Sequence, residues 1–224
     1  MTALDAALAG LGTTVLLALP TWAVSVWRHD ASLVDRMWPV FIAGAAATYA
    51  VLLPVASTRG VWMLVLVGLW AVRLCAYLTW RNWGHGEDRR YRAIRARNEP
   101  GFALKSLVLV FGLQAVLAWI VAAPFLPGLA ATRPIGALDV VGIALAVFGI
   151  ACESVADAQM ARFKADPANA GRVMDRGLWA RSRHPNYFGE ACTWWGIWLL
   201  AVGGAGGAGA WSIVSPGLMT LLLL

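Results

Sequence analysis

The most informative shortage in this sequence is charge. Only 13% of the 224 residues are Asp, Glu, Lys or Arg, whereas 60% are hydrophobic. Ordinary soluble domains carry about 25% charged residues, so a chain with this composition does not resemble one. The shortage excludes a water-soluble globular protein and indicates a membrane protein.

Residues that bind metals or act as nucleophiles are also scarce. The three histidines, His29, His85 and His184, form no H-x-x-x-H pair, which excludes the many-histidine sites of di-iron desaturases and hydroxylases. The three cysteines show no C-x-x-C spacing and are typical of buried thiols. No G-x-S-x-G sequence occurs, so the usual nucleophile signature of an acyl hydrolase is missing. We therefore expect no metal site.

The two ends of the chain lack different features. The first ten residues, MTALDAALAG, contain no Lys or Arg, so they lack the basic region of a cleaved signal peptide. We expect the first apolar span to be retained. The last residues, LLLL, have no polar flank, and we expect a polar C-terminal tail to be missing from the sequence as given.

What the chain does have is a series of long apolar runs. A helix needs about 20 apolar residues to cross the hydrocarbon core of a membrane. Runs that meet or approach this length predict an all-α polytopic bundle of about seven transmembrane helices, forming a single domain over residues 1–224. The expected spans are 4–27, 37–54, 61–80, 105–126, 138–157, 190–203 and 211–224.

The basic residues predict which way the bundle faces. Three linkers, 28–36, 81–105 and 158–189, hold 15 of the 18 Lys and Arg residues and fall on one side if the seven spans alternate. Arg59 and Arg133 fall in linkers on the other side. By the positive-inside rule the basic side is cytoplasmic, and the N-terminus lies outside. The net charge of +6 therefore reflects topology and does not point to nucleic acid.

One glycine-rich motif does not indicate a nucleotide site. Residues 204–209, GAGGAG, fit the G-x-G-x-x-G pattern of nucleotide-binding proteins, but no strand precedes them. We expect a flexible loop on the outer side instead.

Charged residues inside or at the ends of apolar spans mark a candidate site. Arg73, Tyr77 and Arg81 follow one another at four-residue intervals, so they lie on one stripe of a helix. Glu153 and Asp157 share one face of another helix in the same way. These two acids need donors, and we expect the arginines of the next linker to supply them: Arg172, Arg176, Arg181 and Arg183. The arrangement is either an internal salt-bridge network or a pocket for a polar, phosphorylated molecule.

The segment RHPNYFGE, residues 183–190, predicts the start of a helix. Pro185 suits the first helical position, and the free N–H groups of the first turn favour an anion. Glu190 lies one turn after Asn186, on the same face. This geometry suits a phosphate-bearing cofactor lying across the membrane surface.

Together these motifs resemble a known family. EDRRY (87–91), ESVADAQMARFKADPAN (153–169) and GRVMDRGLWARSRHPNYFGE (171–190) are similar to a bacterial group of unknown function related to steroid 5-alpha-reductase. The resemblance begins near residue 32 and is strongest over 153–198. It implies a helical membrane bundle that binds NADPH from the cytosol and transfers hydride to an activated carbon–carbon double bond of a lipid. The cofactor contacts it implies are Glu153, Asp157, Arg162, Arg172, Trp179, Arg183, His184, Asn186, Tyr187 and Glu190.

Hydride addition to an enone leaves negative charge on the carbonyl oxygen, so the site needs a proton donor and a dry cavity. A tyrosine supported by a carboxyl group suits this role. Tyr77 and Tyr91, with Glu87 nearby, are our candidates. Glu153 departs from the family pattern, because the animal enzymes are expected to carry an amide there.

Two other classes stay open. Membrane methyltransferases of the isoprenylcysteine and phospholipid type share the R-H-P-x-Y motif and bind S-adenosylmethionine. A lipid-binding protein without enzymatic activity is the third reading. The 16 arginines against 2 lysines, with abundant Ala and Gly, indicate GC-rich coding, and we expect a bacterial cytoplasmic membrane protein whose partners are membrane lipids and a hydrophobic substrate. The identity of the lipid and the oligomeric state do not follow from the sequence.

Overall fold

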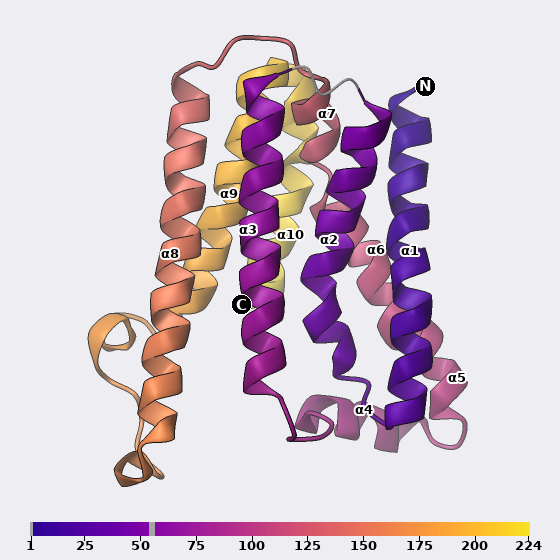
Figure 1. Cartoon of the computed structure of the whole chain (residues 1–224), viewed down its shortest axis with the longest axis vertical. Coiled ribbons are helices and arrows are strands. Elements are labelled where there is room, and N and C mark those ends of the chain that lie inside the picture. The colour runs from indigo at the N-terminus through magenta and orange to yellow at the C-terminus, as the bar shows by residue number, and fades with distance from the viewer. Residues whose placement is uncertain (1, 54–56) are drawn as a thin grey trace.

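The computed structural model describes residues 2–53 and 57–224, and every regular element within these ranges is helical. The prediction of an all-α bundle is therefore confirmed. The long helices run side by side along the longest axis of the molecule (Figure 1). The α-helices are α1 (Ala3–Arg28), α2 (Leu33–Leu52), α3 (Thr58–Arg81), α4 (Arg89–Asn98), α5 (Phe102–Ser106), α6 (Leu113–Val121), α7 (Phe125–Ala130), α8 (Ala137–Ala165), α9 (Pro185–Ala205) and α10 (Val214–Leu223).

Within the described residues, five helical ranges are long and apolar enough to cross a membrane: Ala3–Arg28, Thr58–Arg81, Phe102–Ala130, Ala137–Ala165 and Pro185–Leu223. The chain is accordingly that of an integral membrane protein. The last of these ranges contains α9, a 3-10 helix over Gly206–Ile213, and α10, which runs back beside α9 in Figure 1. The count of seven spans and the outward placement of the N-terminus stay predictions.

Several helices extend further than their apolar runs. Helix α2 begins at Leu33 instead of 37, and α8 continues to Ala165 instead of 157. Apolar length marks only the hydrocarbon-spanning part of a helix, which can continue into the polar interface. Helix α9 begins at Pro185, because the fixed φ of proline suits the first helical position. The expected end of the second span, residue 54, lies outside the described residues.

The expected loop at 204–209 is wrong. Helix α9 ends at Ala205, and the 3-10 helix begins at once with Gly206. A Cβ atom on Gly204 would lie 2.8 Å from a guanidinium nitrogen of Arg59, and one on Gly209 would lie 2.8 Å from the carbonyl oxygen of Ala201. The glycines here serve close packing at a tight reversal.

The prediction that Arg59 lies in a linker is also wrong. Arg59 belongs to α3 and is fully buried, with its Nε 2.5 Å and an Nη 2.9 Å from the carboxylate of Asp139 on α8. Its guanidinium also donates to the carbonyl oxygens of Arg133 and Pro134. Asp139 in turn accepts from the N–H of Gly136 at the start of α8. A charge can be buried here because every part of the pair is hydrogen-bonded.

Helices α8 and α9 pack backbone to backbone. A Cβ atom on Gly196 would lie 2.5 Å from the carbonyl oxygen of Gly142, and one on Gly189 would lie 2.6 Å from the backbone nitrogen of Glu153. Small residues allow such close approach between helices in lipid, where packing drives association. This seam fixes the register that sets Glu153 and Asp157 opposite the first turns of α9.

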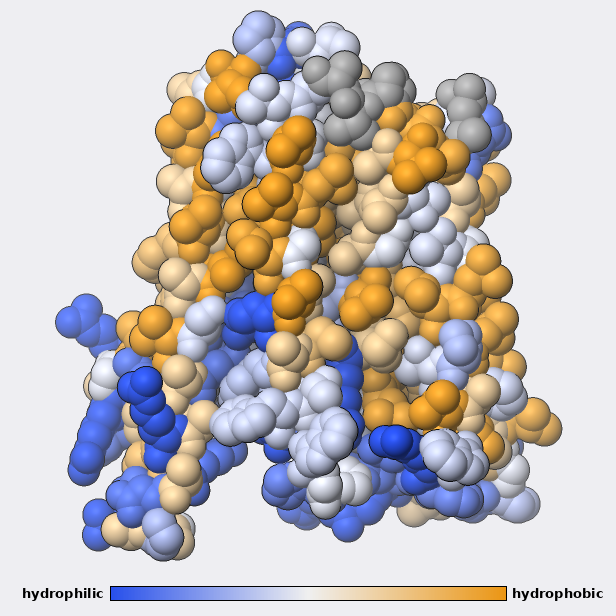
Figure 2. Space-filling view, viewed as in Figure 1, coloured by the Kyte–Doolittle hydropathy of each residue, from blue (hydrophilic) through white to orange (hydrophobic). Residues whose placement is uncertain are grey.

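Polar residues gather at one end of the bundle. Figure 2 shows hydrophilic surface at the lower end, around α4 and the loop between α8 and α9, and mainly hydrophobic surface along the helices above it. The α1–α2 turn, the α3–α5 segment and the α8–α9 loop all lie at this end in Figure 1, opposite the N-terminus. We call it the basic end, after the 15 Lys and Arg residues of its three linkers.

The close packing of α8 on α9 predicts that one added methyl group at this contact lowers the stability of the protein. We expect Gly196→Ala to lower the free energy of unfolding by about 1–3 kcal/mol, the usual cost of overpacking. The matched control is Gly68→Ala on α3, where an added Cβ meets nothing within 4 Å. Thermal unfolding of detergent-purified protein measures both. Equal melting temperatures for the two variants would contradict the seam.

Candidate functional site

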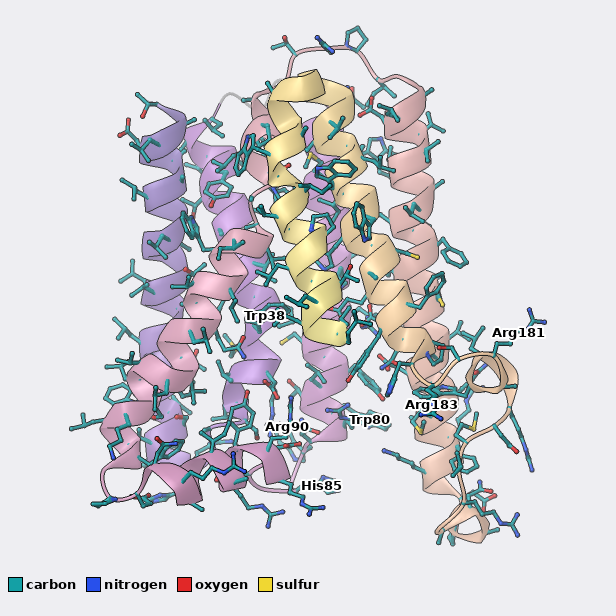
Figure 3. All side chains as sticks on the ribbon, turned by 180° about the vertical axis from the view of Figure 1, so that it is seen from behind. Trp38, Trp80, His85, Arg90, Arg181 and Arg183 are labelled. Carbon is teal, nitrogen blue, oxygen red and sulfur yellow. The ribbon has the colours of Figure 1, made fainter. Side chains whose placement is uncertain are left out.

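A cavity of about 340 Å³, which we call the central cavity, lies inside the bundle toward its basic end. Its apolar wall includes Trp38 on α2 and Met219 and Leu223 on α10. Figure 3 shows Trp38 beside the end of α10 and Arg90 below it, at the basic end. The polar and charged lining residues are Asp35, Tyr77, Arg81, Arg90, Gln114, Glu153, Asp157, Asn186, Tyr187 and Glu190.

Arg73 on α3 holds two of the carboxylates in place. It forms an ion pair with Glu153, and its Nη1 lies 2.6 Å from the Asp157 carboxylate. The amide of Asn186 donates to the other oxygen of Asp157 at 3.4 Å. One arginine thus ties α3 to α8, and one amide ties α8 to α9. The i, i+4 spacing predicted for Glu153 and Asp157 is what lets a single guanidinium contact both.

Two acceptor atoms at this cavity have no hydrogen-bond partner. Among the residues that the structure describes, neither Oε2 of Glu153 nor Oδ1 of Asn186 accepts a hydrogen bond, although both atoms are buried. Glu153 is only 3% exposed and lines the cavity. Buried polar atoms are normally satisfied, and an exception at a cavity points to a missing donor. A ligand that offers hydroxyl or amide N–H groups would supply it.

The mouth of the cavity carries charges of both signs. Arg90 on α4 lies 2.8 Å from the carboxylate of Asp35 on α2, and Tyr91 donates its hydroxyl to the same carboxylate at 2.6 Å. Burial raises the pKa of Tyr91, and the charge of Asp35 raises it further, so its hydroxyl stays protonated. These contacts fasten α4 across the basic end of the bundle.

Five of the predicted cofactor residues share this cavity: Glu153, Asp157, Asn186, Tyr187 and Glu190. The others lie elsewhere. Arg162 borders a separate hollow between α3 and α8, and Arg172 borders another at the tip of the α8–α9 loop. The indole of Trp179 donates to the carbonyl of Ala156 at 3.0 Å and holds the loop against α8.

Arg183 and His184 are exposed, and the His184 ring stacks on that of Tyr187 with 4.8 Å between their centroids. Figure 3 shows Arg181 and Arg183 on the α8–α9 loop, apart from the central helices. The expectation that the arginines of this loop pair with Glu153 and Asp157 is wrong, because Arg73 does so. Arg172, Arg176, Arg181 and Arg183 form no ion pair with any described residue.

Of the three predicted catalytic residues, only Tyr77 lines the central cavity. Tyr91 is buried behind Asp35. Glu87 binds Arg95 through two hydrogen bonds and accepts from the N–H of Ala31, so its carboxylate anchors the α1–α2 turn to α4. Partial burial raises the pKa of Glu87, but these hydrogen bonds and the charge of Arg95 outweigh it, and the pKa lies below its usual value.

The sequence did not predict that residues of α2 line the cavity. Asp35 and Trp38 line the cavity, but their place in an expected linker and an apolar run gave them no functional signal. Gln114 had a weak signal as the polar residue in the middle of an apolar span. Within the described ranges, no cluster of His, Cys, Asp or Glu side chains has the arrangement of a metal site.

The Arg73 pairs predict a large loss of stability on removal of the arginine. Arg73→Gln leaves two buried carboxylates without their partner, and breaking such a pair costs about 3–5 kcal/mol. Adding Glu153→Gln and Asp157→Asn removes the orphaned charges, so the triple variant recovers most of the loss. Thermal unfolding in detergent measures both, with exposed, unpaired Arg172→Gln as the control. A single variant as stable as the wild type would show that Arg73 does not hold the site together.

Comparison with known proteins places the chain in a family. Residues 21–224 match the family model described as "Protein of unknown function (DUF1295)". The chain is also 29% identical over 218 residues to the uncharacterized protein C594.04c of Schizosaccharomyces pombe. That match covers 85% of this chain and 63% of the yeast protein, so the chain spans less than two thirds of its relative's length. No solved structure matches. Because the family model covers nearly the whole chain, the protein belongs to the DUF1295 family.

Proposed function

We propose that this protein is a membrane-embedded, NADPH-dependent reductase that transfers hydride to an activated carbon–carbon double bond of a hydrophobic substrate. The observation that carries the proposal is the pair of unpartnered acceptors, Glu153 Oε2 and Asn186 Oδ1, at a cavity whose mouth bears Arg81 and Arg90. The kinship with steroid 5-alpha-reductase is part of the proposal and rests on the motifs of residues 87–91 and 153–190.

The residues present fit such a cofactor. Carboxylate and amide oxygens suit the hydroxyl groups of a ribose and the N–H groups of a carboxamide, whereas arginines suit phosphates. A cavity of about 340 Å³ is at the lower end of the range for ligand pockets. It would take one end of a dinucleotide and leave the phosphates at the mouth. Arg162, Arg172, Trp179, Arg183 and His184 would contribute only if the α8–α9 loop folds over that mouth.

When bound, the cofactor supplies a hydride. The chain itself must then stabilise the charge that develops on the substrate oxygen and deliver a proton. Tyr77 is the candidate donor, since it lines the cavity one helical turn from Arg73 and one from Arg81. The apolar side chains of α2, α6 and α10 keep water from the inner part of the cavity.

The proposal includes an orientation. Fifteen of the 18 Lys and Arg residues lie in the linkers of the basic end, so this end would face the cytoplasm of a bacterial cell and the cavity would open toward cytosolic nucleotide. The seven-span count, with the N-terminus outside the cytoplasmic membrane, follows from the same assignment.

A methyltransferase that uses S-adenosylmethionine is the second candidate, and the charge of the cavity favours it. Glu153, Asp157 and Glu190 line the cavity, and the first two share the single cation of Arg73, so the inner part of the cavity has more negative than positive groups. A negative site suits a sulfonium cation better than it suits a pyrophosphate.

Ligand-dependent melting separates the readings. A ligand that binds only the folded protein raises its stability by about 2.7 kcal/mol at 100 times its Kd. We expect NADPH to raise the melting temperature of the detergent-purified protein and S-adenosylmethionine to leave it unchanged. The reverse result would establish the methyltransferase reading over ours, and no response to either would favour a lipid-binding protein without a nucleotide site.

Two variants locate the binding. Asn186→Ala removes a cavity acceptor, so we expect the NADPH-induced shift to shrink while the ligand-free protein keeps its fold. Arg172→Ala, in the separate hollow at the tip of the α8–α9 loop, tests whether the loop contacts the nucleotide, and we expect this variant to keep the shift. Loss of the shift in Arg172→Ala alone would place the nucleotide on the loop instead of in the cavity.

A further inference from the structure

A second cavity, also of about 340 Å³, lies on the other side of the Arg73 pairs, between α3 and α8. Its lining includes Arg73, Tyr77, Trp80, Asp157, Ala158 and Ala161. Tyr77 and Asp157 border both cavities, so they form the wall between them. We call this second space the lateral cavity.

The lateral cavity opens among residues that face the membrane. On α3, Leu69 and Val72 are exposed above it, and on α8, Val155 is exposed beside it. These are large apolar side chains in segments that are apolar enough to span a bilayer. Figure 2 shows hydrophilic residues inside a hollow between α8 and α3, with hydrophobic surface on both helices around it. A polar interior is therefore reachable from the lipid side at this place.

The other face of α8 is closed. Along its contact with α9, the glycine backbones leave no room even for a methyl group. Between α3 and α8, Arg73 pairs with Glu153 and Asp157. The small residues Ala158 and Ala161 follow these pairs on α8 toward the basic end. One side of α8 is therefore closely packed against α9, and the other side borders an open cavity.

We propose that the lateral cavity is the entrance through which a membrane lipid reaches the central cavity from within the bilayer, and that this lipid is uncharged, with an apolar body and a hydrogen-bond-accepting oxygen. The inference rests on the proposed function and adds to it the class of substrate and its route. The charge around the lateral cavity decides the class of lipid. Two cations, Arg73 and Arg162, are matched here by two carboxylates, Asp157 in the lining and Glu153 paired with Arg73. Burying an anionic head and burying a cationic head would each carry a desolvation penalty that no net opposite charge offsets.

A neutral carbonyl escapes both penalties and can accept a hydrogen bond from Tyr77, which borders both cavities. Trp80 is exposed at the rim, where an amphipathic ring suits the membrane–water interface. In this arrangement the water-soluble ligand enters from the basic end and the lipid from the side. The two meet at Tyr77 and Asp157 without competing for one opening.

Photolabelling in vesicles tests the entrance. The full chain is reconstituted in phosphatidylcholine vesicles with a long-chain methyl ketone that carries a diazirine, and labelled peptides are mapped by mass spectrometry. We expect labels on residues 73–80 and 154–161. Ala158→Trp fills the lateral cavity and should lower this labelling by about tenfold or more, and Ala161→Trp should do the same if the first variant does not fold.

The matched control is Ala151→Trp, because Ala151 is exposed two turns before Ala158 on the same face of α8 and does not line the lateral cavity. It should keep the labelling of the wild type. Equal labelling in all variants, or stronger labelling by the corresponding fatty acid, overturns the proposal. The melting temperature with NADPH, measured in the same preparations, tests the two proposals separately. Ketone labelling without an NADPH-induced shift would support the lipid entrance and contradict the reductase function. An NADPH-induced shift without ketone labelling would support the reductase function and contradict the lipid entrance.

Discussion

The arrangement of the cavity at the basic end depends on one partly buried arginine. Arg73 lies inside a membrane-spanning helix, where an unpaired charge is costly, and it is held there by Glu153 and Asp157 on α8. The pairing leaves Nε of Arg73 without a hydrogen-bond acceptor and Oε2 of Glu153 without a donor, although both atoms are buried. A site built purely for stability would close this gap with another donor. The open acceptor beside a cavity supports our proposal that a ligand binds here.

The close packing of α8 on α9 makes that arrangement possible. Glycines at the seam let the two backbones approach until Glu153 lies against Gly189, and the first turn of α9 then brings Asn186 within hydrogen-bond distance of Asp157. A second buried pair, Arg59 with Asp139, ties the opposite ends of α3 and α8 together. Helices α3 and α8 are therefore joined near both ends, and the lateral cavity lies beside the pair nearer the basic end.

The sequence predicted those features that depend on local periodicity. Apolar length gave the helical membrane bundle, four-residue spacing gave the shared face of Glu153 and Asp157, and Pro185 gave the start of α9. It could not predict which arginine pairs with these acids, because Arg73 is distant in sequence and the arginines of the α8–α9 loop are nearer. The contact of Tyr91 with Asp35 and the pairing of Glu87 with Arg95 also depend on how α4 crosses the basic end. No local sequence pattern encodes that crossing.

We propose that the central cavity, which Glu153 and Asn186 line, holds a nucleotide. A structure determined by electron cryomicroscopy in lipid nanodiscs, with NADPH present in excess, tests it most directly. We expect density for the nucleotide inside the cavity, in contact with Glu153 and Asn186, with the Arg73 pairs intact. A cavity without nucleotide density, in which Glu153 and Asn186 take their missing hydrogen bonds from other side chains of the protein, would contradict it.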